Sequence, residues 1–428
     1  MIEDDIYRTS SQYRLWSFTE ESLRSVRQNT NRLASDRVRV ALRRAREARQ
    51  SANSSAAGTP NPNAGASDAD NKAGEEKDIE CLTPEEEQDL VRYYCEQIIQ
   101  LGESYKPPMP TTVRATAIQY LRRFYLTNSP MTYHPKTIMP CALFIATKTD
   151  NYYMSLRHFA DGVPGDATAE DIIAPEFLVM QSLRFTFDVR HPFRGLEGGI
   201  MELNAIAQGL GQPAPHLPMQ TAEDLRHALS SLPPAPNNPS SSSISDRLAR
   251  AHHNSREILK SAAQMTDAYF LYTPSQIWLS ALSIADQLLA QFYLDTKLPN
   301  PSETDHEHPL VRLRAKLLQT LTSCTTLLHS YKPLASDPEQ KKALRQIGKK
   351  LYHCQNPEKV NLAGQKRIPA AAASAAAASR SANLSENATP DSEIERLAKK
   401  RKLEAEQQKA GDIFGGELVM ERTKERQV

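Results

Sequence analysis

Apolar residues recur three and four positions apart along much of the chain, which is the spacing of helices that bury one face. This pattern predicts a first group of five helices, two of which begin near Thr83 and Thr111 and three of which cover 135–149, 155–161 and 168–184. It predicts a second group over 194–208, 244–271, 274–291 and 309–331. Neither group contains the alternating runs or hairpin turns that are typical of strands. The predicted fold class is therefore all-α.

Two of the predicted helices share a sequence signature at a fixed separation of 139 residues. Seven identities match without a gap: Tyr133, Pro135, Ile138, Ala142, Leu143, Ile145 and Ala146 recur as Tyr272, Pro274, Ile277, Ala281, Leu282, Ile284 and Ala285. Each copy opens on Tyr-x-Pro, and proline suits the first turn of a helix because its missing N–H would have no partner there. We therefore expect two tandem copies of one five-helix unit, each with a buried central helix.

The remaining segments divide the chain further. We expect an N-terminal docking segment and helix over 1–35, a basic stretch with a disordered linker over 36–82, a first repeat over 83–188, a second repeat over 189–335 with a disordered insert over 211–243, a C-terminal packing helix over 336–355, and a low-complexity, charged tail over 356–428. The helix of the first segment is predicted over about 19–33, and Trp16 and Phe18 are expected to dock it.

Composition limits the classes of function. The net charge is +1, which excludes attraction of the whole chain to nucleic acid or to an anionic membrane. No run of 18 apolar residues occurs, and the polar first residues do not resemble a signal peptide. The five cysteines are widely spaced and contain no Cys-x-x-Cys pair. We expect a soluble intracellular protein with structural thiols, without metal, membrane contact or direct nucleic-acid binding.

The sequence shows no catalytic motif. It lacks a glycine-rich phosphate loop, a kinase His-Arg-Asp motif and a cluster of spaced metal ligands. We therefore expect no enzymatic activity, no cofactor and no small-molecule substrate. The arginine-rich stretch from Arg37 to Arg49 has two interpretations, a solvated continuation of the preceding helix or a contact with an acidic partner surface.

Three segments resemble the cyclin superfamily: RRFYLTNSPMTYHP from Arg122, SSQYRLWSF from Ser10, and LYTPSQI from Leu271. The similarity extends over about 16–205 and 244–355. It is strongest to the cyclins of the CDK-activating kinase. The resemblance implies a regulatory subunit that activates a cyclin-dependent kinase acting on kinase activation loops and on the RNA polymerase II C-terminal repeat. It also implies a RING-finger assembly subunit and the TFIIH core as partners, and a nuclear location.

The resemblance also implies site residues. Lys148 corresponds to a lysine that donates to backbone carbonyls beside the kinase's regulatory helix, and Glu176 to an acid that accepts backbone N–H groups there. Met180, Phe185 and Phe187 resemble the family's apolar contact row. Taken alone, these residues also fit solvated charges and ordinary core. Gln287 occupies the position equivalent to Lys148, so we expect the first repeat alone to use these contacts.

Other interpretations stay open at this stage. A nucleic-acid-binding factor similar to transcription factor IIB, which also has two cyclin-type repeats, would need a zinc ribbon and basic repeats that this sequence lacks. A non-activating helical scaffold is the third possibility. The basic run Lys399, Lys400, Arg401 and Lys402 fits either a nuclear import signal or a solvated charged helix. Asn151 stands where many cyclins have an acid.

Overall fold

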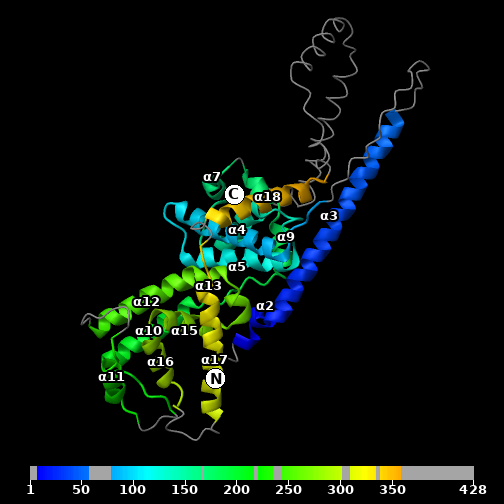
Figure 1. Cartoon of the computed structure of the whole chain (residues 1–428). Coiled ribbons are helices and arrows are strands. Elements are labelled where there is room, and N and C mark those ends of the chain that lie inside the picture. The colour runs from blue at the N-terminus through cyan, green and yellow to red at the C-terminus, as the bar shows by residue number, and fades with distance from the viewer. Residues whose placement is uncertain are drawn as a thin grey trace, which may run out of the picture. The chain divides into compact units, whose positions relative to one another are not determined.

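The computed structural model describes residues 7–56, 79–165, 167–215, 220–234, 243–300, 309–333 and 338–357. Every regular element in these ranges is a helix, as Figure 1 shows, and none of them is long and apolar enough to span a bilayer. The predicted all-α class is confirmed. The candidate import signal at 399–402 and the rest of the tail beyond residue 357 lie outside the described residues.

The first repeat packs its helices around a central one. Its helices are α4 (Pro84–Ser104), α5 (Thr111–Thr127), α6 (Pro135–Thr149), α7 (Leu156–Gly162), α8 (Ala169–Ile173) and α9 (Glu176–Ser182). The central helix is α6, which begins at the predicted proline and buries Ala142 and Ala146 completely. The prediction of a single helix over 168–184 was wrong, because the helix is interrupted at Ala174–Pro175 and forms α8 and α9 instead. Proline has no N–H to donate, and within a helix its ring clashes with the carbonyl group of the residue four positions earlier.

The second repeat follows the same plan with more interruptions. Its helices are α10 (Phe193–Ala207), α11 (Ala222–Ser230), α12 (Ile244–Lys260), α13 (Ala262–Met265), α14 (Ala268–Leu271), α15 (Pro274–Ala285), α16 (Gln287–Asp295) and α17 (Pro309–His329). The helix predicted over 244–271 is therefore three helices, broken where Ser261 leaves helical geometry at φ −108° and ψ −86°.

The helix predicted over 274–291 is also divided. Asp286 adopts φ −156° and ψ 97°, which ends α15. Its carboxylate accepts the N–H of Leu289 at the start of α16 and forms a buried ion pair with Arg247, with distances of 2.7 and 2.9 Å. These interactions stabilise the break and separate the second repeat's central helix from the residues that follow it.

The prediction of a disordered insert over 211–243 was wrong in its middle. Helix α11 forms there, and a capping box between Thr221 and Asp224 satisfies its first N–H groups. Leu225 and Leu229 on one face are buried in the core of the second repeat. Residues 216–219 and 235–242 on either side lie outside the described residues.

The segments that flank the repeats pack against the body that the repeats form. They form α2 (Ser11–Trp16), α3 (Glu20–Ala56) and α18 (Pro338–Gln355). Helix α3 extends beyond the predicted end near residue 33 and continues through the arginine-rich stretch, as one of the two interpretations of that stretch held. Ala34, Val38 and Leu42 lie on one stripe of α3, and they share a core cluster with α18 and with the beginning of α4. This shared core explains the continuation, and it confirms that α18 packs back on the body.

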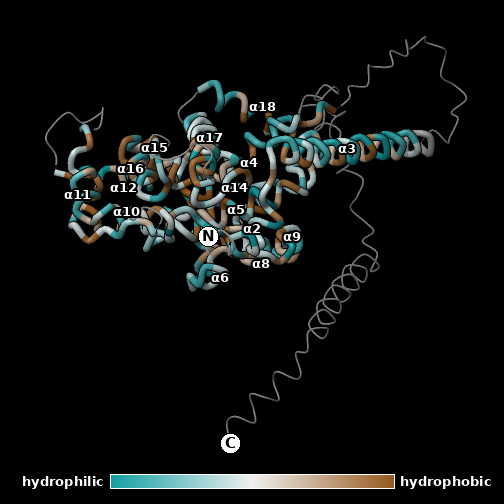
Figure 2. Tube along the Cα trace, turned by 90° about the horizontal axis from the view of Figure 1, so that it is seen from below, coloured by the Kyte–Doolittle hydropathy of each residue, from teal (hydrophilic) through white to brown (hydrophobic). Residues whose placement is uncertain are grey.

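Figure 2 shows polar and apolar residues mixed along α3, rather than one wholly polar surface. Its N-terminal half joins both repeats, since Leu23 contacts a small cluster that contains Trp16, Leu126 and Phe270. α3 therefore has separate contacts with the body at its beginning and in its middle.

Candidate functional site

The two charged residues assigned from the resemblance lie side by side. Lys148 is in the last turn of α6 and Glu176 is the first residue of α9, and the Lys148 Nζ lies 2.5 Å from the Glu176 Oε1. Their side chains are 49% and 24% exposed. The ammonium group also lies 4.7 Å from the centre of the Phe144 ring, a favourable cation–π position. The structure thus brings both residues to one surface, where they pair with each other.

An aromatic pair lies on the same short helix and on the loop that follows it. Phe177 on α9 is 65% exposed and Phe185 after α9 is 55% exposed, and their ring centres are 6.2 Å apart. Two adjacent side chains of this size on the surface cost solvation free energy unless a partner covers them. The pair, together with Lys148 and Glu176, is termed the charged–aromatic face below.

The backbone after α9 turns Phe185 outward. Arg184 and Phe185 have φ values of 54° and 53°, in the left-handed region that non-glycine residues adopt at a cost of about 1–3 kcal/mol each. Hydrogen bonds hold this turn, from the Arg184 N–H to the Gln181 carbonyl at 2.9 Å and from the Phe185 N–H to the Met180 carbonyl at 3.0 Å. The strained turn lets Leu183 enter the core while the Phe185 ring stays in solvent.

The other two residues of the predicted apolar row lie deeper. Met180 and Phe187 are half-buried and pack against the core of the first repeat, and Phe187 also makes an edge contact with Tyr120. Sequence reasoning gave Phe177 no site role. The signal was present, because Phe177 is two positions before the buried Val179 and therefore about 200° around the helix from it.

The N-terminal helix braces the turn that carries Phe185. The Trp16 indole is buried and donates from Nε1 to the Thr186 Oγ1 at 3.0 Å. The Arg184 guanidinium lies 5.6 Å from the Trp16 ring. Farther along, Gln12 accepts the Arg190 N–H at 2.7 Å. The docking of Trp16 is thus connected directly to the geometry of the charged–aromatic face.

The second repeat has no equivalent of the Lys148 side of this face. Gln287 comes after the break at Asp286, so it begins α16 instead of ending the central helix. In the first repeat the chain continues helically to Thr149, and Asn151 then takes a φ of 56° just after the helix end. Asparagine tolerates this left-handed conformation better than most residues, which gives Asn151 a local structural role.

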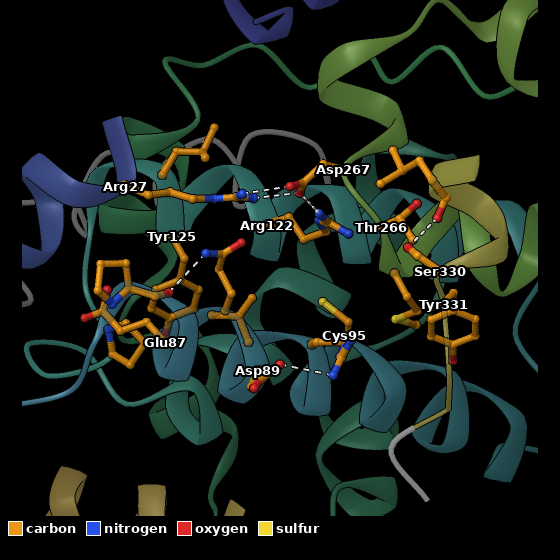
Figure 3. A pocket seen from close by; sticks show the side chains of 18 residues that line it. Arg27, Glu87, Asp89, Cys95, Arg122, Tyr125, Thr266, Asp267, Ser330 and Tyr331 are labelled. Atoms are coloured by element: carbon orange, nitrogen blue, oxygen red, sulfur yellow. Dashed lines mark hydrogen bonds and ion pairs between the residues drawn. The ribbon is translucent and has the colours of Figure 1, made fainter. Parts of the chain in front are cut away.

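A separate cavity of about 230 Å³ lies between α3, α4, α5, α13 and α17. Figure 3 shows Asp267 facing Arg27 and Arg122 across it. The Arg27 side chain donates two hydrogen bonds of 2.7 Å to Asp267, and Arg122 adds a third of 2.5 Å. These charges satisfy each other, so the cavity marks a structural junction between the repeats. No group of three metal-binding side chains occurs within the described ranges.

Comparison with known proteins defines the family. A model of the cyclin N-terminal domain matches residues 71–188, and a model of the cyclin C-terminal domain matches residues 191–329. Together the two models match more than half of the chain. The protein therefore belongs to the cyclin family.

Individual relatives narrow the similarity. The chain is 31% identical to cyclin CCL1 of Saccharomyces cerevisiae over 72% of this chain and 65% of that protein, so it spans slightly less than two thirds of that relative. It is 29% identical to cyclin-H of Xenopus laevis over 68% of this chain and 78% of that protein. The solved CAK complex from Chaetomium thermophilum, bound to ATP-γ-S, contains a chain that is 32% identical, with a TM-score of 0.61, covering 87% of this chain and 96% of that one.

Proposed function

We propose that this cyclin binds and activates the cyclin-dependent kinase of a CDK-activating kinase complex, through the charged–aromatic face of the first repeat. The observation that carries the proposal is that the Lys148–Glu176 ion pair and the exposed Phe177–Phe185 pair meet at consecutive residues of α9, Glu176 and Phe177. The similarity to a chain of the solved CAK complex supports the choice of partner. The activity resides in the kinase, and this chain is its regulatory subunit.

The chemistry of the face suits a backbone target. An ammonium group donates to carbonyl oxygens and a carboxylate accepts N–H groups, and charge-assisted bonds are roughly twice as strong as neutral ones. Lys148 and Glu176 offer both kinds of group side by side. In the complex, each is expected to exchange part of its mutual ion pair for backbone groups of the kinase's regulatory helix. Phe177 and Phe185 supply apolar area beside them, as aromatic anchors do in interfaces.

Activation follows from holding that helix in place. A protein kinase needs its β3 lysine paired with a glutamate of the αC helix before the phosphates and magnesium are aligned. The face stabilises the inward position of αC and shifts the kinase population toward the active state. The short α9 and its hydrogen-bonded turn present the aromatic rings in a fixed arrangement. We expect a persistent interface of about 2,000 Å² or more.

The same proposal includes the wider assembly. We propose a RING-finger assembly subunit and the TFIIH core as further partners, the kinase activation loop and the polymerase C-terminal repeat as targets of the complex, and a nuclear location. The basic run at 399–402 remains the candidate import signal. Neither a IIB-like role nor an inert scaffold gains support from an observation of the charged–aromatic face.

A pull-down from nuclear extract tests both the proposed function and the role of the charged–aromatic face. The tagged chain is incubated with nuclear extract, and the eluate is assayed for kinase protein and for phosphorylation of a C-terminal-repeat peptide. The Phe177→Ala/Phe185→Ala variant should lose most of both signals. Met201→Ala is the matched control, since Met201 is an exposed apolar residue of the second repeat, at 72% exposure. Absence of any kinase from the wild-type eluate refutes the proposed function. If Phe177→Ala/Phe185→Ala recovers as much kinase as the wild type and Met201→Ala do, the charged–aromatic face is not the kinase-binding surface.

A further inference from the structure

The middle of α3 carries a second surface that the proposed function does not use. Leu33, Asp36, Arg37, Val40, Ala41 and Arg44 lie at helical spacing and line a shallow depression, and the Asp36 carboxylate is paired with Arg32 and Arg39. They lie on a different stripe from Ala34, Val38 and Leu42, which are buried against the body. This set is termed the α3 basic stripe. Figure 1 shows the C-terminal part of α3 running beyond the helices on which its middle packs.

The stripe combines positive charge with exposed apolar area. The stretch from Asp36 to Arg49 contains six arginines and two acids, in a chain whose net charge is +1. Arg39 pairs with Asp36 at 3.2 Å, while Arg37 and Arg44 are exposed and form no ion pair with any residue in the described part of the chain. Leu33 is 45% exposed beside them. Charges and apolar groups that face solvent together in this way are what an amphipathic partner covers.

We propose that the α3 basic stripe is a docking site for an acidic amphipathic helix of another protein. Charge complementarity determines the sign of the partner's charge, because Arg37 and Arg44 form no ion pair within the described part of the chain, whereas Asp36 is paired with Arg39. A guanidinium binds a carboxylate through two parallel hydrogen bonds. Helical geometry determines its form. From Leu33 to Arg44 the stripe covers three turns, about 16 Å, along which apolar anchors three, four and seven positions apart can meet it.

The apolar members distinguish a protein partner from nucleic acid. A phosphate backbone is bound through charge and hydrogen-bond donors, and its affinity does not depend on burying leucine and valine. In the stripe, Leu33, Val40 and Ala41 share one depression with the two arginines and with Asp36, whose carboxylate is paired with Arg39. A helix with carboxylates flanking a row of leucines matches both components, whereas a nucleic acid leaves the apolar component exposed.

Binding of a defined probe tests this chemistry on the full-length chain. The probe is a fluorescent three-heptad peptide with Leu at positions a and d and Glu at positions e and g. The reference probes are the same peptide with Lys in place of Glu, and a short DNA duplex. Fluorescence anisotropy at low salt should show the acidic peptide binding at least about tenfold more tightly than the lysine peptide, since complementary charge both attracts and orients the partner.

Two variants separate the components of the surface. Arg37→Glu/Arg44→Glu should weaken binding of the acidic peptide by about tenfold or more, and Leu33→Ser/Val40→Ser should weaken it by a similar factor. The control Lys316→Glu/Lys341→Glu makes the same charge change at exposed positions of α17 and α18 and should bind as the wild type does. Circular dichroism establishes that each variant keeps its helices.

Three results overturn the proposal. Tighter binding of the DNA duplex than of the acidic peptide assigns the stripe to nucleic acid. If the arginine variant weakens binding of the acidic peptide and the leucine–valine variant does not, the α3 basic stripe is only a nonspecific basic surface. Absence of binding by the acidic peptide removes the docking site. None of these results affects the kinase-binding proposal, since that rests on residues of α6, of α9 and of the turn after α9.

Discussion

Substitution of Asp267 by asparagine is expected to destabilise the junction between the two repeats severely. Asp267 at the start of α14 accepts three hydrogen bonds, two from Arg27 of α3 and one from Arg122 of α5 (Figure 3). Asparagine keeps the shape but removes the negative charge that both guanidinium groups face. Because Arg122 is one-tenth exposed, its charge has little access to water.

The magnitude follows from the burial of the partners. Removing one member of a buried charged network while its partners remain costs about 3–5 kcal/mol. Burial alone would raise the pKa of Asp267, but hydrogen bonds from Arg27 and the positive charges of Arg122 and Arg27 lower the pKa below its usual value. A lowered carboxyl pKa contributes stability that is complete above the unfolded pKa and is lost as the pH falls through the folded one. The full cost is therefore expected at pH 7.

Urea denaturation of the full chain measures this cost. With an m-value of about 3 kcal/mol/M, the midpoint should fall by about 1 M or more at pH 7. The difference between wild type and Asp267→Asn should narrow as the pH falls below 3.8. Asp36→Asn is the matched control, because its ion pairs are more than half exposed and should contribute less than about 1 kcal/mol. A change of under about 0.5 kcal/mol for Asp267→Asn would show that the charge of Asp267 does not stabilise the junction.

Three further predictions address other parts of the fold. Burial raises the pKa of Glu87 to about 7, so the free energy of unfolding of the wild type should fall by up to ~3 kcal/mol as the pH rises from 4.5 to 7. Glu87→Gln should not show this fall. Urea midpoints across this range measure it, and the same pH dependence in both proteins would contradict the prediction. Leu42→Ala should cost about 2–5 kcal/mol and speed amide hydrogen exchange in α3 and α18, and unchanged exchange would remove α3 from the shared core. Trp16→Ala should lower the affinity for the kinase, because it removes the contacts of Trp16 with Arg184 and Thr186 that hold the turn at Phe185. An affinity equal to that of the wild type would show that the turn keeps its conformation without Trp16.

The parts of the fold that depend on local signals could be predicted from sequence. Both central helices begin at their predicted prolines, Pro135 and Pro274, and α4 begins at Pro84, directly after Thr83, where a helix start was predicted. The break at Pro175 was also encoded locally but was overlooked. The break at Asp286 was not accessible in this way, because its buried partner Arg247 lies 39 residues earlier on another helix.

The length of α3 depended on distant residues in the same way. Its middle is held by side chains of α4 and α18, which no pattern within residues 20–56 reveals. For the charged–aromatic face, the resemblance supplied Lys148 and Glu176, but their mutual ion pair is a result of the structure. The outward turn of Phe185 and the exposure of Phe177 depend on the backbone after α9, where positive φ values in non-glycine residues have no clear sequence signature.

A charge exchange between Lys148 and Glu176 distinguishes a contact with the kinase from an ion pair that only joins α6 to α9. Affinity for the purified kinase is measured by calorimetry for Lys148→Glu, Glu176→Lys and the double variant, which restores an ion pair with reversed polarity. If these groups contact the kinase backbone, each single variant should lose about 2–5 kcal/mol of binding free energy, and the double variant should remain weak. If they only hold α6 to α9, the double variant should recover wild-type affinity. That recovery would contradict the assignment of Lys148 and Glu176 to the kinase interface.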